Sequence, residues 1–86
     1  MIRAEELAQI TWRYYCIKYK KTIEDIDSYI QSLAAEGLCH TGYVFSDSQE
    51  AGFIFKYCEK LGYKCSITKN LDTLLSEVKI SWEHLL

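Results

Sequence analysis

The sequence has no proline and only four glycines among its 86 residues. Because these residues interrupt helices and strands, each glycine marks a place where an element is expected to end. Uninterrupted apolar stretches of membrane-spanning length are also absent, and the acidic N-terminus does not have the form of a secretory signal. We therefore expect an intracellular, cytoplasmic protein that does not enter the membrane.

An excess of charge of one sign is absent too. Ten basic and 12 acidic side chains give a formal net charge of -2, so no overall positive field attracts a phosphate backbone or an anionic membrane. The apolar fraction of 49%, with 14% aromatic residues, is typical of a globular protein. A chain of this length holds one hydrophobic core, which predicts a single domain over residues 1–86 and excludes a multidomain enzyme.

Sequence motifs for catalysis or for metal binding are missing. The chain contains no Walker loop, dinucleotide fingerprint, G-x-S-x-G or H-E-x-x-H motif. Zinc sites pair their ligands at short intervals such as C-x-x-C, whereas the four cysteines here are irregularly spaced, at Cys16, Cys39, Cys58 and Cys65. We expect free thiols, no metal, no cofactor and no enzymatic activity.

Apolar residues recur at steps of three and four in the first third of the chain, which predicts an N-terminal helix or helix pair within residues 1–36. The period fails at residues 20–22, where Thr22 and Asp25 have the spacing of a capping box. This predicts either a break near Thr22 or one long helix with two apolar faces. Gly37 is expected to end the region in the left-handed conformation.

Residues 38–86 have the alternation of a β-α-β-β unit, with strands expected over 40–45, 63–69 and 74–82 and a capped helix that ends at Gly62. A strand-helix-strand connection is expected to be parallel and right-handed, and the last two strands antiparallel. The sequence therefore predicts an α+β fold with a small three-stranded mixed sheet, one face of which is covered by helices.

The first helix carries more aromatic surface than one small core is expected to hold. We predict a homo-oligomer that associates through this helix, because aromatic residues are typical of interface cores. The predicted interface residues are Trp12, Tyr15, Ile17 and Tyr19. The alternative is that the helix folds back on its own sheet while its tyrosine hydroxyls reach water.

Basic residues alternate with these aromatic residues, at Arg13, Lys18, Lys20 and Lys21. They are candidates for phosphate contact, with the rings stacking on bases, and Lys64 and Lys79 on the polar face of the sheet are candidates for an anionic ligand. Acidic residues follow at once, which favours an ordinary solvated helix end. A nucleotide-sequestering module and a nucleic-acid-binding module are therefore alternative functions.

Two short segments of the second half are shared with a known type of protein: Leu61-Gly62-Tyr63-Lys64-Cys65 and Ile80-Ser81-Trp82. On these segments the chain resembles small phage-encoded αβαββ proteins, in which a helix ends in LGYK and a C-terminal hairpin ends in ISW. The resemblance implies a phage origin and a compact fold, and it transfers no site residue. We expect a non-catalytic accessory protein that binds a protein target, in host counter-defence or as a virion component.

Overall fold

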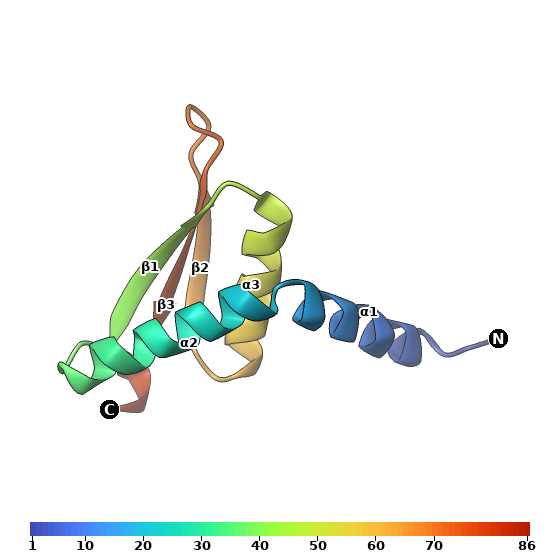
Figure 1. The fold of residues 1–86 in the computed structure, drawn as a ribbon, viewed down its shortest axis with the longest axis horizontal. Helices are drawn as coiled ribbons and strands as arrows, with labels where there is room; N and C mark the ends of the chain where they lie inside the picture. Colours follow the sequence, from blue (N-terminus) through green and yellow to red (C-terminus); the bar gives the residue numbers. More distant parts are fainter.

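The computed structural model describes residues 1–86 and contains three helices and three strands (Figure 1). These elements are α1 (Ala4–Lys18), α2 (Lys20–Ala35), β1 (His40–Phe45), α3 (Ser48–Lys60), β2 (Lys64–Lys69) and β3 (Ser76–Ser81), followed by a short 3-10 turn at Glu83–Leu85. The α+β fold class is confirmed. None of the helices combines the length and the apolar character that crossing a membrane requires.

The two N-terminal helices meet at Tyr19, whose backbone (φ -105°, ψ 20°) departs from the helical conformation. Tyr19 takes part in backbone hydrogen bonds to both helices: its N–H donates to the Tyr15 carbonyl at 2.9 Å, and its carbonyl accepts from Ile23 N–H at 3.0 Å. The predicted capping role of Thr22 is wrong, because Thr22 lies inside α2, whose N-cap residue is Tyr19, and no side chain caps this helix start. The Thr22 hydroxyl instead donates to Glu50 Oε2 at 2.9 Å and joins α2 to α3.

The other predicted helix ends are confirmed. The Asp47 carboxylate accepts hydrogen bonds from the backbone N–H groups of Gln49 and Glu50, at 2.9 and 3.4 Å, and so caps the start of α3. Gly37 and Gly62 follow α2 and α3 with φ of 85° and 97°. Only glycine adopts this left-handed conformation without strain, which explains why both helices stop there.

The sheet has the strand order β1-β3-β2, and both pairs of neighbours are antiparallel. The predicted antiparallel pairing of β2 with β3 is confirmed, whereas the predicted mixed sheet is wrong. β1 and β2 do run in the same direction, but β3 lies between them. The connection through α3 leaves a gap of one strand, and the β2–β3 hairpin folds back to fill it. In this central position Val78 and Ile80 of β3 are completely buried.

Helices α2 and α3 cover one face of the sheet, as predicted, and the other face carries polar side chains. A single core lies between the helices and the sheet, built from Tyr19, Ile26, Ile30, Phe45, Ala51, Phe53, Ile54, Cys58, Val78 and Ile80. The predicted start of the last strand at Leu74 is wrong. Leu74 lies exposed in the connecting loop with φ of 59°, and β3 begins with the buried Ser76.

Candidate interaction surface

One face of α1, which we call the inner face, packs on α3 through aromatic rings. Trp12 lies against Phe53 at a ring-centroid distance of 4.7 Å and stacks on Tyr57 at 6.1 Å. Tyr15 and Tyr19 also contact Phe53, at 5.8 and 5.4 Å. These ring contacts hold α1 to α3, together with a hydrogen bond that Gln49 Nε2 donates to the Tyr15 hydroxyl at 2.8 Å. Three of the four predicted interface residues therefore serve the packing of the chain itself, and Tyr19 is only 6% exposed.

The opposite face of α1, which we call the outer face, is apolar and uncovered. It consists of Leu7, Ile10, Tyr14 and Ile17, which are 50%, 55%, 58% and 76% exposed. Their spacing of three, four and three residues is that of the a and d positions of a heptad repeat, which form the seam between packed helices. The outer face thus has the residue types and the spacing of a helix–helix contact, and it includes Ile17 from the predicted interface.

The exposed surface of the whole chain agrees with an uncovered α1. The chain exposes 6354 Å², whereas a compact protein of its mass exposes about 5,300 Å². Its radius of gyration is 14.3 Å, compared with about 12 Å for a compact domain of this length. Figure 1 shows the reason, because α1 extends away from the sheet and ends far from it, and α1 contains no buried residue.

No protein family model, curated protein or solved structure matches this chain.

The candidate phosphate-binding residues near the helix junction are mostly engaged with neighbours on their own helices. Lys20 and Lys21 form ion pairs with Glu24 and Asp25, at 3.9 and 3.6 Å. The Lys18 ammonium lies over the rings of Tyr15 and Tyr19, and the neighbouring tyrosines, Tyr19 above all, raise its pKa above 10.5. Arg13 is exposed and lies in none of the ion pairs. These cations lie on solvated helix surface.

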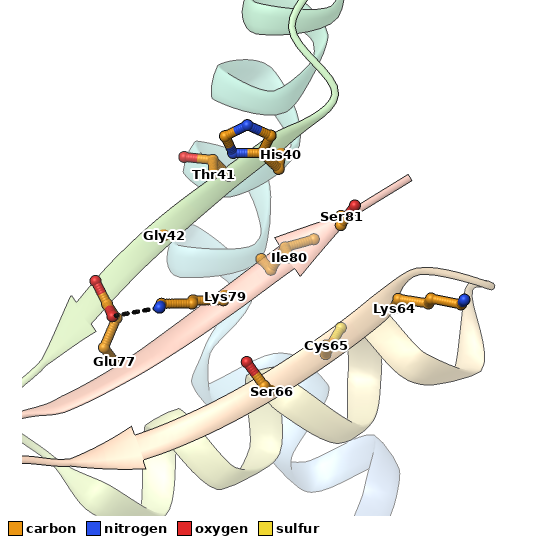
Figure 2. Close-up of a pocket in the computed structure, with 10 residues that line it drawn as sticks. All are labelled: His40, Thr41, Gly42, Lys64, Cys65, Ser66, Glu77, Lys79, Ile80 and Ser81. Carbon is orange, nitrogen blue, oxygen red and sulfur yellow. Dashed lines mark ion pairs between the residues drawn. The ribbon is translucent and has the colours of Figure 1, made fainter. Parts of the chain in front are cut away.

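The two candidate lysines of the sheet, Lys64 and Lys79, lie in a different place. They line an open hollow of about 520 Å³ on the uncovered face of the sheet (Figure 2). His40, Ser66, Glu77 and Ser81 are also among the residues that line it, and no helix contributes. The Glu77 carboxylate lies 4.0 Å from the Lys79 ammonium and offsets its charge. The structure therefore separates the predicted basic residues into two groups on different surfaces.

All four thiols are free, and no group of three His, Cys, Asp or Glu side chains is close enough to hold a metal ion. Burial, and then the neighbouring Cys65, raises the pKa of Cys58 to about 12. Its thiol therefore keeps its proton at neutral pH, and a protonated thiol is a poor nucleophile.

The interface predicted from the sequence includes only Ile17 of the outer face. The prediction named Trp12 and Tyr15 because aromatic residues are typical of interface cores, but aromatic rings also fill the core of a small domain. The heptad spacing of Leu7, Ile10, Tyr14 and Ile17 was the available signal, because it groups residues by direction instead of by size.

Proposed function

We propose that this chain is a non-catalytic accessory protein of phage type that associates with itself through the outer face of α1 and acts by binding a protein target. The target is a host protein, in counter-defence or takeover, or another virion component. The observation that carries the proposal is the exposed outer face, Leu7, Ile10, Tyr14 and Ile17, which has heptad spacing and lies on a helix that contains no buried residue.

The energetics favour covering the outer face. Each of its four side chains is at least half exposed, and removing that much apolar surface from water stabilises an assembly by about 1 kcal/mol per side chain. A second copy presents the same face, and contacts between identical patches related by a two-fold axis are the commonest in soluble oligomers. The resemblance to small phage-encoded proteins supports the wider role and its place in the host cytoplasm or the virion.

A charged residue in the outer face tests the association. Ile10→Glu introduces a carboxylate at the centre of the outer face, and Gln9→Glu introduces the same charge one residue away on the exposed polar side of α1. We expect light scattering after size exclusion to give an assembly for the wild type and for Gln9→Glu, and about half that mass or less for Ile10→Glu. A monomeric wild type at micromolar concentration contradicts the proposal, as does identical behaviour of the two variants.

A further inference from the structure

The free side of β1 is the second unpartnered surface of the chain. Trp82 N–H donates to the Cys39 carbonyl at 3.0 Å just before β1 begins. In an antiparallel pair, hydrogen-bonded residue pairs alternate with non-hydrogen-bonded pairs. Because Cys39 is hydrogen-bonded to Trp82, the backbone groups of Thr41, Tyr43 and Phe45 also face β3. Every second residue of β1 therefore directs its N–H and C=O away from the sheet: His40, Gly42 and Val44. These outward groups have no hydrogen-bond partner elsewhere in the chain.

The two edges of the sheet differ in how they are protected against pairing. β2 carries a lysine at each end, Lys64 and Lys69, and lysines on an edge strand oppose the addition of another strand. β1 contains no Lys, Arg, Asp, Glu or proline and consists largely of aromatic and β-branched residues, which favour strands. In Figure 1 no strand lies beyond β1 on its outer side, and the only helix that reaches past it there is the C-terminal end of α2, at the start of β1. β1 is thus the edge that can accept a further strand.

We propose that the outer edge of β1 is a strand-pairing site and that its occupant is β1 of a second copy of this chain, running antiparallel. This surface is separate from the outer face of α1, and its use does not depend on association through α1. The product is a continuous sheet of twice the size, in which the outward groups of three residues of each copy form about six backbone hydrogen bonds.

The register of this pairing follows from the outward residues. Since His40, Gly42 and Val44 are evenly spaced, a two-fold axis at Gly42 sets each Gly42 opposite its copy and each His40 opposite Val44 of the other copy. On the covered face the same register sets Tyr43 opposite Thr41 of the other copy. Aromatic and β-branched residues form favourable cross-strand pairs, and no like charges face each other in β1.

Gly42 suits the centre of such an axis. Glycine within a strand often marks the close approach of another backbone. The missing side chain also leaves room for Glu77, whose Oε2 lies 3.1 Å from the position that a Cβ of Gly42 would take. Because Glu77 is paired with Lys79 at 4.0 Å, each copy brings an ion pair and no net charge to the axis (Figure 2). The edge of β1 is therefore electrostatically compatible with itself.

Amide hydrogen exchange on the native protein tests this pairing. We expect the outward amides of β1 (His40, Gly42 and Val44) to exchange at least about tenfold more slowly than the outward amides of β2 (Cys65, Ile67 and Lys69). Dilution to nanomolar concentration should abolish the difference. Equal exchange at the two edges at high micromolar concentration overturns the proposal. The same difference in Ile10→Glu shows that it arises independently of α1, so failure of the α1 association is recognised separately.

A pair of proline variants in the Ile10→Glu background provides the matched control. Val44→Pro removes one outward N–H from the β1 edge, and Ile67→Pro removes one from the β2 edge, while both leave the bonds to β3 in place. We expect Val44→Pro to be monomeric and Ile67→Pro to stay dimeric by light scattering. Two dimeric variants overturn the proposal. Circular dichroism checks the fold, and if Val44→Pro does not fold, the exchange measurement decides alone.

Discussion

Cys58 is the side chain whose protonation responds most strongly to folding. It lies near the end of α3 at 5% exposure, and burial together with Cys65 on β2 raises its pKa from 9.0 to about 12. In the unfolded chain the thiol loses its proton near pH 9, whereas the folded chain keeps it. Between these values the folded state binds more protons than the unfolded state, so the stability that depends on a protonated Cys58 is fully present below pH 9 and decreases as the pH rises toward 12.

We predict that the free energy of unfolding falls by about 1.4 kcal/mol per pH unit across this alkaline window because of Cys58. Cys58→Ala removes this slope, although it lowers stability at neutral pH by about 1 to 2 kcal/mol through the cavity it leaves. Urea unfolding of both proteins in reductant, followed from neutral pH to pH 11 or so, measures the difference. Because Cys65, Tyr43 and Tyr63 titrate in both proteins, equal alkaline slopes contradict the prediction.

At the scale of elements, α3 depends on the carboxylate of Asp47, which satisfies two backbone amides at its start. We predict that Asp47→Ala lowers the free energy of unfolding by about 1 kcal/mol, because these amides lose their protein partner. Ser46→Ala, one residue earlier and exposed, is the control and should change stability by less than about 0.5 kcal/mol. Urea unfolding at neutral pH measures both, and an equal effect of the two substitutions refutes the capping role.

The elements themselves were predictable where their causes are local. β1 has its predicted bounds because an aromatic and β-branched run stands between Gly37 and the cap at Asp47. The position of β3 between β1 and β2 was not predictable, because it depends on how the hairpin fits the gap left by α3. Likewise, the sequence indicated that α1 carries more aromatic surface than one small core holds, but only the position of Phe53 on α3 determines which face of α1 is covered. The alternation of polar and apolar residues predicted that Lys79 and Glu77 lie on the surface of the sheet. Their ion pair, and the position of Glu77 beside Gly42 of the neighbouring strand, depend on how the strands pair in the folded sheet.

At the scale of the whole molecule, the two unpartnered surfaces lie on different sides. Figure 1 shows α1 extending to one end of the long axis, which measures 49 Å, and β1 at the opposite side of the sheet. Association at one surface therefore leaves the other accessible. The two proposed pairings, each with a second copy, would together join dimers into a closed tetramer or into an open chain, depending on the angle between the two axes.

We predict that the wild-type chain forms assemblies larger than a dimer, and that blocking one surface leaves a dimer. Ile10→Glu blocks α1 and Val44→Pro blocks β1, so each single variant should have the mass of a dimer and the double variant that of a monomer. Light scattering on all four proteins at matched concentration measures this series. A wild type of dimeric mass means that only one surface is used, and the single variant that becomes monomeric identifies it. A double variant that stays dimeric reveals an interface outside both surfaces and contradicts the assignment of either one.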